Sequence, residues 1–284
     1  MGTSSSYGGP KGKNPLLPSD FDANNSDSNN TEDNSPNKDN PNDNPDLSKS
    51  NINSTQLWGN VKKQFSSLAK RPSNSKLKSA LSSYVKANGG SSKTAIGSNS
   101  GRITTRNVGQ FFSSVNSSGI YKTFEKYHIS YTGKNIEDIL GDVINALAPI
   151  PNTKEDSIAK NALLDTLESV YKEIIESGED IESMDNLDSE SFNDLMQTYI
   201  TSYIYQKVLN DLESRFEEYS KSVGSTLKLE EDIKEYINGV VVNVTQDTNF
   251  ESMDFSSNQT ESIISDIYKD CFEVIEKELS NEGN

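Results

Sequence analysis

Histidine, cysteine and tryptophan each occur only once in the 284 residues, as His128, Cys271 and Trp58. A single cysteine excludes an intramolecular disulfide framework and is typical of a reducing cytosol. A single histidine leaves no second imidazole for a His-based metal site or a His–His dyad. We expect His128, between Tyr127 and Ile129, to be a packing residue. We expect Cys271, on an apolar helix stripe, to be a small buried hydrophobe.

Long hydrophobic runs are also missing. No stretch approaches the ~18–20 apolar residues that a membrane-spanning helix needs, and the first residues lack the basic and apolar regions of a secretory signal. Together with the cysteine usage, these absences predict a cytoplasmic protein with no membrane partner. Apolar residues make up only 32% of the chain, so part of its length is expected to lie outside the core.

The segment from Ser19 to Asn53 consists almost entirely of Asn, Asp, Ser and Pro. Such a composition cannot bury enough apolar surface to offset the entropy lost on ordering, so we expect a disordered linker with a reach of roughly 30 Å. The chain then divides into an N-terminal recognition and modification tip (1–18), this linker (19–53), a basic helical region (54–134) and an acidic helical bundle (135–284).

The net charge of −16 is distributed unevenly. Leu47–Asn135 holds fourteen Lys and Arg and a single acid, Glu125, whereas Ile136–Asn284 holds ten basic and 34 acidic residues. A nucleic-acid-binding adaptor that uses residues 54–134 is one interpretation. The region has only three Arg, however, and shows no aromatic–basic alternation and no zinc knuckle. We favour docking on an acidic surface, either the chain's own second half or a partner protein.

Apolar residues recur at spacings of three and four almost everywhere after residue 53, which predicts an all-α helical bundle preceded by a long disordered N-terminal arm. The expected helices cover residues 57–68, 77–88, 104–115, 136–147, 158–178, 192–219, 229–244 and 263–279. Pro72 ends the first of them, and Thr153 with Asp156 resembles a capping box. Val240–Val244 looks strand-like, but its continuity with a helical stripe favours the buried end of a helix.

No catalytic or metal-binding constellation is apparent. The carboxylates fall on solvated helix faces, without a Glu-x-x-His pair or an EF-hand loop. Residues 89–94, GGSSKT, imitate a phosphate-binding loop, but Ser92 stands where glycine must precede the lysine, and a helix takes the place of the strand. We therefore predict a binding or substrate protein and not an enzyme, with no catalytic residue and no metal ligand; a cryptic enzyme is the least favoured alternative.

The N-terminal stretch that opens with MGTSSS is the most informative part of the sequence. Gly2 is small, and in this context the initiator Met1 is usually removed, which exposes a glycine α-amine with a pKa near ~8. The following Thr and Ser residues provide groups by which an extended peptide can be held in a cleft. The stretch MGTSSS also satisfies the N-myristoylation pattern, so an N-myristoylated peripheral membrane protein is a further alternative. The adjoining arm is acidic, however, and offers no second membrane signal.

Five stretches stand out beyond these patterns: MGTSSSYGGP, NPLLPSDF, YVKANGG, GRITTRNVGQFFSSV and ALAPIPNTKEDSIAKNALLDTLE. Together they resemble the QatB family of the four-gene Qat anti-phage defence systems of bacteria. The resemblance covers the tip and residues 54–170; the remainder is similar only in its helical character.

The resemblance implies a defined set of partners. In that family QatB acts with QatA, a P-loop ATPase, with QatC, which is similar to the deazaguanine-synthesis enzyme QueC, and with QatD, which is similar to TatD nucleases. QatC is the implied binding partner, and QatA and QatD are further candidates. The zinc, the ATP and the deazaguanine substrate belong to the partner enzyme, so this chain is expected to need no cofactor of its own.

The resemblance also implies a chemical role for the tip. The QueC-like enzyme would activate 7-carboxy-7-deazaguanine with ATP and transfer it to the amine of Gly2, which is the acceptor of the modification. The implied recognition residues lie on both sides of the first proline: Thr3, Ser4, Ser5, Tyr7, Gly8, Gly9, Pro10, Leu16 and Leu17.

Overall fold

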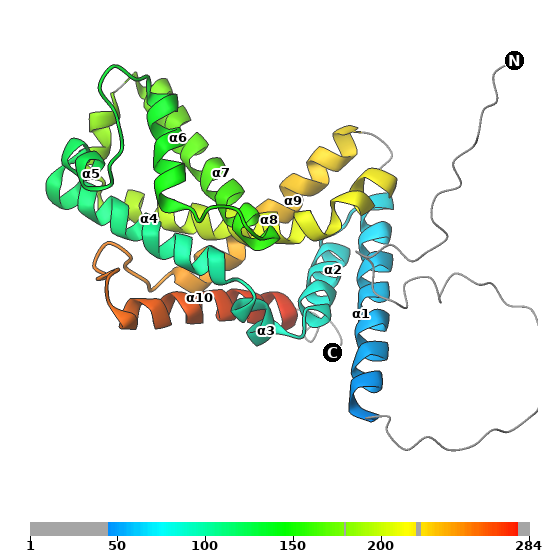
Figure 1. The fold of residues 1–284 in the computed structure, drawn as a ribbon. Coiled ribbons are helices and arrows are strands. Elements are labelled where there is room, and N and C mark those ends of the chain that lie inside the picture. Colours follow the sequence, from blue (N-terminus) through cyan, green and yellow to red (C-terminus); the bar gives the residue numbers. More distant parts are fainter. Residues whose placement is uncertain (1–44, 179, 220–222, 278–284) are drawn as a thin grey trace, which may run out of the picture. The chain divides into compact units, whose positions relative to one another are not determined.

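The computed structural model describes residues 45–178, 180–219 and 223–277 (Figure 1). The tip and most of the expected linker, residues 1–44, lie outside the described residues. The described ranges contain ten α-helices and one 3-10 helix, and no strand. The all-α fold predicted from the periodicity is therefore confirmed for this part of the chain.

The first two helices, α1 (Pro45–Lys70) and α2 (Asn74–Ala87), form an antiparallel pair. α1 begins twelve residues before the helix expected at 57–68, within the stretch 19–53 that was assigned to the linker. A proline is favoured at the first helical position, where its missing N–H is not needed. Pro72 ends α1 as expected, and the Ser73 side chain caps α2 by accepting from the N–H of Lys76.

Three helices follow between residues 91 and 126, where the sequence predicts only one. They are α3 (Ser91–Ile96), α4 (Asn99–Ser118) and α5 (Ile120–Lys126). Gly90 and Gly119, with φ of +89° and +86°, form the sharp turns that start α3 and α5. The helix expected at 104–115 is thus the middle of the longer α4.

The next two helices begin at side-chain caps, and the cap of α7 is the one predicted from the sequence. α6 (Ile136–Leu147) is capped by Asn135, and α7 (Lys154–Ser177) carries the complete capping box between Thr153 and Asp156. Gly178 ends α7 in the left-handed conformation. A short 3-10 helix, η2 (Ile181–Asn186), then leads to α8.

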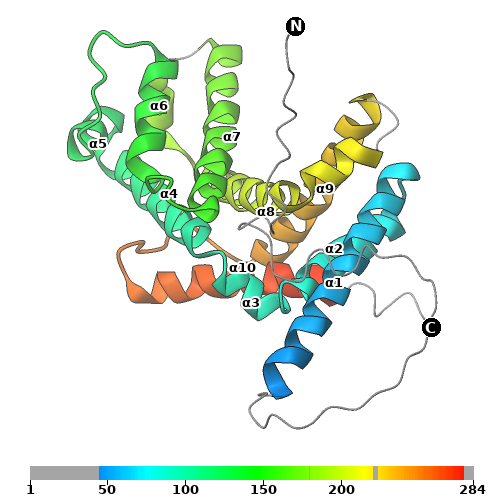
Figure 2. The ribbon, with the colours of Figure 1, turned by 45° about the vertical axis from the view of Figure 1, so that its right-hand side comes forward.

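The last three helices are α8 (Ser189–Tyr219), α9 (Val223–Thr245) and α10 (Asn258–Lys277). Val240–Val244 lies in the final turns of α9, so the helical interpretation of this apolar run is confirmed. α8 packs against α4, α7 and α9, while α10 packs against α2, α3, α4 and α9. In Figures 1 and 2, α6 and α7 lie on one side of α4 and α8, and α10 lies on the other.

The buried apolar side chains form one cluster that includes residues on both sides of residue 134. Its centre is the inner face of α8, where Phe192, Met196, Tyr199, Ile200 and Tyr203 are fully buried. Residues 46–284 form one compact unit. The division at 134/135 is one of charge, and the domain boundaries proposed from the sequence stay predictions.

Two glycines let neighbouring segments, α8 and the loop before α10, approach α4 closely. A side chain at Gly101 would overlap the ring of Tyr203, and one at Gly109 would overlap the ring of Phe255. Both rings are buried, so neither has space to move aside. The glycines of α4 are therefore packing positions, eight residues apart on the same helix.

Two ion pairs between described residues join the basic segment to the acidic one. Arg106 pairs with Glu261 and Lys134 pairs with Asp142, both at half-exposed positions. Apolar contacts between α10 and α2, α3 and α4 also hold the two segments together. Whether the basic surface also docks on an acidic partner stays a prediction.

Candidate functional site

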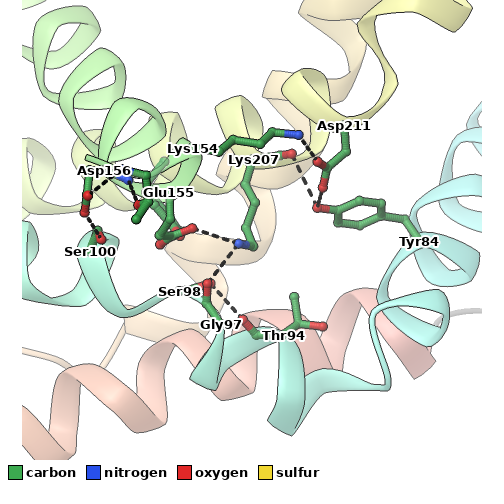
Figure 3. A network of polar contacts seen from close by, with 12 residues as sticks. Tyr84, Thr94, Gly97, Ser98, Ser100, Lys154, Glu155, Asp156, Lys207 and Asp211 are labelled. Atoms are coloured by element: carbon green, nitrogen blue, oxygen red, sulfur yellow. Dashed lines mark hydrogen bonds and ion pairs between the residues drawn. The ribbon is translucent and has the colours of Figure 1, made fainter. Parts of the chain in front are cut away.

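The residues expected to carry the modification lie outside the described residues. This applies to the acceptor, Gly2, and to all the recognition residues: Thr3, Ser4, Ser5, Tyr7, Gly8, Gly9, Pro10, Leu16 and Leu17. Within the described part, the most extensive polar cluster lies where the start of α7 meets α8, α2 and the turn between α3 and α4 (Figure 3).

The centre of this cluster is a largely buried ion pair between Lys207 of α8 and Glu155 in the first turn of α7. The Lys207 Nζ lies 3.0 Å from the Glu155 Oε2, and the two side chains are 12% and 20% exposed. The same ammonium donates to the carbonyl oxygen of Gly97, 3.1 Å away, and the Tyr203 hydroxyl donates to the other oxygen of Glu155. One carboxylate and one ammonium therefore join α7, α8 and the α3–α4 turn.

A second carboxylate, Asp211, extends the cluster towards α2. It accepts hydrogen bonds from the Lys154 Nζ at 2.5 Å and from the Tyr84 hydroxyl at 2.8 Å. Tyr84 is fully buried, and burial together with the neighbouring Asp211 charge raises the pKa of its phenol well above the usual value. Tyr84 is thus a permanent donor that fixes α2 to α8.

The third carboxylate, Asp156, fixes α4 to the start of α7. The Ser100 hydroxyl donates to its Oδ1 at 2.6 Å, and the backbone N–H groups of Asn152 and Thr153 donate to its Oδ2. The hydrogen bonds from Ser100 and Thr153 lower the pKa of Asp156. Asp156, which forms part of the capping box of α7, therefore also binds Ser100 of α4.

This network clamps helices together. Burial and the adjacent Glu155 raise the pKa of Tyr203. Both tyrosines of the network, Tyr84 and Tyr203, therefore remain protonated hydrogen-bond donors at neutral pH. Each carboxylate accepts from a lysine or from hydroxyl and N–H groups, and the arrangement orients four chain segments. We assign the cluster a structural role, as the junction that fixes α2, α4, α7 and α8.

A family comparison matches the part of the chain that contains most of this junction. Residues 89–275 match the family model of the Qat anti-phage system associated protein QatB. The chain belongs to this family. No curated protein and no solved structure matches the chain.

Membership in the QatB family gives the chain a role in anti-phage defence and makes other Qat components its candidate partners. The matched range extends from the turn before α3 to the last turns of α10. It therefore includes every residue of the network except Tyr84. The family resemblance is thus confirmed, and two of the five sequence stretches, GRITTRNVGQFFSSV and ALAPIPNTKEDSIAKNALLDTLE, lie within the matched range.

The sequence analysis did not predict this network, although most of its residues lie in the range that matches the QatB family. The one usable signal was Lys207 itself, which interrupts the apolar run YIYQKVL at residues 203–209. A lysine among buried residues requires a partner. Nothing local to Glu155 or Asp211 distinguishes them from the many carboxylates on solvated helix faces.

Cys271 is fully buried in α10, as expected, and burial raises the pKa of its thiol to about 12. His128 differs from the expectation of a packing residue. It is exposed, with φ of +56°, in the turn after α5, where the N–H of Ile129 bonds to the carbonyl of Phe124. The left-handed turn buries Ile129 and directs His128 to solvent.

The segment that imitates a phosphate-binding loop also has a defined role. It follows the helix α2, not a strand, so the structure agrees with the rejection of a nucleotide loop. The N–H of Ser91 at the start of α3 is bonded by the Glu276 carboxylate of α10, at 2.9 Å. A carboxylate of the chain itself thus lies where a phosphate-binding loop would hold its ligand.

No group of three or more metal-ligating side chains suited to a metal ion occurs among the described residues. Within the same residues, no helix has the length and apolar character needed to cross a membrane.

Proposed function

We propose that this chain acts in anti-phage defence as the protein substrate of a QueC-like partner, QatC, with the α-amine of Gly2 as the acceptor. Three features support the proposal: the QatB family match, the Met-Gly start, and the long polar segment between that start and the helices. The feature that carries it is the small glycine at position 2, because a residue without a side chain lets an enzyme's pocket close around a bare terminus.

The proposed reaction consumes ATP in the partner's active site. The carboxylate of 7-carboxy-7-deazaguanine attacks the α-phosphate of ATP, which forms an acyl adenylate and releases pyrophosphate. The Gly2 amine then attacks the acyl carbon, an amide bond forms, and AMP leaves while the amine loses a proton. An α-amine with a pKa near ~8 is partly uncharged at neutral pH, unlike a lysine amine near ~10.4.

The distance between Gly2 and the folded body suits this role. The first described helix begins at Pro45, 43 residues after Gly2. A chain of that length can span roughly 150 Å when fully extended. The acceptor can therefore enter the active site of a separate protein while the helices stay outside it.

Intact-mass measurement after co-expression with the QueC-like partner tests the proposal. The expected result is an added mass equal to that of the deazaguanine acid less one water, located on the N-terminal peptide. Gly2→Pro should abolish it, because proline presents a hindered secondary amine. An unmodified N-terminal peptide in the wild-type protein after this co-expression would contradict the proposal.

A matched control identifies the reacting amine. The tip also contains two lysines, Lys11 and Lys13, whose side chains are the other candidate nucleophiles. Lys11→Arg with Lys13→Arg keeps the charge of the tip and should leave the modification intact. Loss of the added mass in this variant would move the acceptor from Gly2 to a lysine and contradict the proposal.

A further inference from the structure

The α1–α2 pair carries a surface that the proposed function does not use. The two helices are antiparallel: the rings of Trp58 and Tyr84 meet edge to face with centroids 6.0 Å apart, and Ser79 donates to Gln64 at 2.5 Å. The chain reverses between them at Pro72. In Figures 1 and 2 the pair lies beside the remaining helices, with α1 on the outside.

A groove of about 600 Å³ lies at the end of this pair where the chain reverses. Five of its seven lining residues are cations: Lys62, Lys63, Lys70, Arg71 and Lys76. The other two are Ser66 and Ser67. The described residues that line it thus include cations and hydroxyls but no carboxylate, aromatic or aliphatic side chain.

Helical spacing explains why these charges gather. Lys62, Ser66 and Lys70 are four residues apart on α1 and share one face, with Lys63 and Ser67 one position further round. Lys76, in the first turn of α2, donates to the carbonyl oxygen of Arg71 at 3.1 Å, which holds the turn against the groove. The groove is therefore formed by α1, α2 and the connection between them.

The surrounding sequence reinforces the positive potential. Residues 47–96, which contain nearly all of α1 and the whole of α2 and α3, hold nine Lys and Arg and no Asp or Glu. Like charges confined to one concave surface repel one another and attract a polyanion. The charge thus indicates a partner with several regularly spaced negative groups.

The lining residues also indicate which polyanion fits. Protein–protein interfaces obtain most of their affinity from buried aromatic or aliphatic anchors, and the described lining residues include none. Single-stranded nucleic acids are held by aromatic rings that stack on the bases, which are also absent from the groove lining. Lys, Arg and Ser are the residues that contact phosphate oxygens. We propose that the groove binds the phosphate backbone of a nucleic-acid duplex, without reading its sequence.

Fluorescence anisotropy with the full chain and a labelled DNA duplex of about 20 base pairs tests this. If all five cations contact phosphates, log K should fall with log salt with a slope of about −4.5, or about 500-fold between about 50 and 200 mM salt. Scrambling the duplex sequence should leave the affinity unchanged. No binding at low salt, or binding that is independent of salt, would overturn the proposal.

A charge-reversal pair locates the contact. Lys63→Glu with Arg71→Glu changes two exposed groove residues that are not part of the core, and should reduce the slope to about −2.7 or less and weaken binding. The matched control, Lys122→Glu with Lys269→Glu, makes the same change in net charge on α5 and α10, at exposed positions. This control variant should keep most of the slope of log K against log salt. Equal losses in the two variants would show that net charge alone is responsible, and would contradict the groove.

Polyglutamate of similar charge distinguishes a protein partner. It should compete with the duplex only weakly, because the groove lacks an anchor for a polypeptide. Displacement of the duplex by polyglutamate at equal charge concentration would overturn the choice of nucleic acid and favour an acidic protein.

Discussion

Lys207 and Glu155 form an ion pair that joins the middle of α8 to the first turn of α7, with 3.0 Å between the Nζ and the Oε2. Both side chains are largely removed from water. A buried pair contributes little net stability compared with an apolar pair of the same shape, but loss of one partner leaves the other charge uncompensated. Replacing either residue alone should therefore lower the stability of the fold, whereas replacing both residues should have a smaller effect.

The first prediction follows from this asymmetry. Lys207→Met should lower the free energy of unfolding by about 3 kcal/mol, because it leaves the Glu155 carboxylate buried without its cation. Adding Glu155→Gln should restore most of the loss. Urea unfolding of both single variants and the double variant gives the coupling energy.

An exposed pair provides the control. Lys172 and Glu168 are four residues apart on the surface of α7, with side chains more than half exposed. Lys172→Met should cost no more than about 0.5 kcal/mol. Equal effects of the Lys172 and Lys207 substitutions would show that burial of the Lys207 pair is not decisive.

The second prediction concerns the close approach at Gly109. Alanine normally stabilises a helix interior relative to glycine by roughly 0.5–1 kcal/mol. At Gly109 the added methyl group would overlap the buried ring of Phe255, so Gly109→Ala should instead destabilise the protein by about 1–3 kcal/mol. Thermal unfolding monitored by circular dichroism measures the change.

Gly141 in α6 is the matched comparison, because a Cβ there would meet no atom within 4 Å. Gly141→Ala should raise the unfolding temperature while Gly109→Ala lowers it. A stabilising Gly109→Ala would mean that α4 and the segment around Phe255 do not pack as closely as described.

The third prediction concerns acid. The pKa of Asp156 is lowered in the folded chain, so its contribution to stability is present above the unfolded pKa of about 3.9 and is lost as the pH falls through the lower folded value. Asp156→Asn should therefore lose less stability than the wild type between about pH 5 and pH 3. Urea titrations at the two pH values check the difference.

Asp247→Asn tests whether net charge alone produces this effect. Asp247 is exposed after the end of α9, and its replacement changes the charge equally. This variant should follow the wild type between the two pH values. If it instead behaves like Asp156→Asn, the hydrogen bonds from Ser100 and Thr153 are not the cause.

The fourth prediction uses the single thiol. Cys271 is fully buried with a pKa of about 12, so iodoacetamide at about pH 8 should alkylate the native protein very slowly and the urea-unfolded protein quickly. Mass spectrometry at successive times gives both rates. Rapid alkylation under native conditions would contradict the packing of α10 against the core.

The helices were predictable because their apolar stripes and caps are local. Thr153 and Asp156, three residues apart, marked the start of α7, and Pro72 marked the end of α1. The start of α1 at Pro45 was not predicted, because the Asn- and Ser-rich residues that follow lack an apolar stripe.

The network around Lys207 could not have been predicted, since its members are far apart in the sequence. Tyr84 and Asp211 are separated by 127 positions, and Ser100 and Asp156 by 56. The capping box identified Asp156 only as part of the start of α7, and no local pattern distinguishes Asp211 from the carboxylates on solvated faces. The basic groove was only partly foreseen: the charge excess was visible, but the alignment of Lys62 and Lys76 depends on how α1 and α2 pair.

The placement of α10 has a consequence for how the protein is made. The Ser82 hydroxyl of α2 donates to the Glu276 carbonyl of α10, 194 residues later, and α10 also covers α3 and α4. A ribosome adding roughly 5–20 residues per second needs roughly 10–40 s to synthesise the intervening chain. During that interval the apolar surfaces of α2, α3 and α4 that α10 covers in the complete fold lack this partner. A chain truncated before α10 is therefore expected to leave these helices exposed to chaperones and proteases, so that only full-length product accumulates.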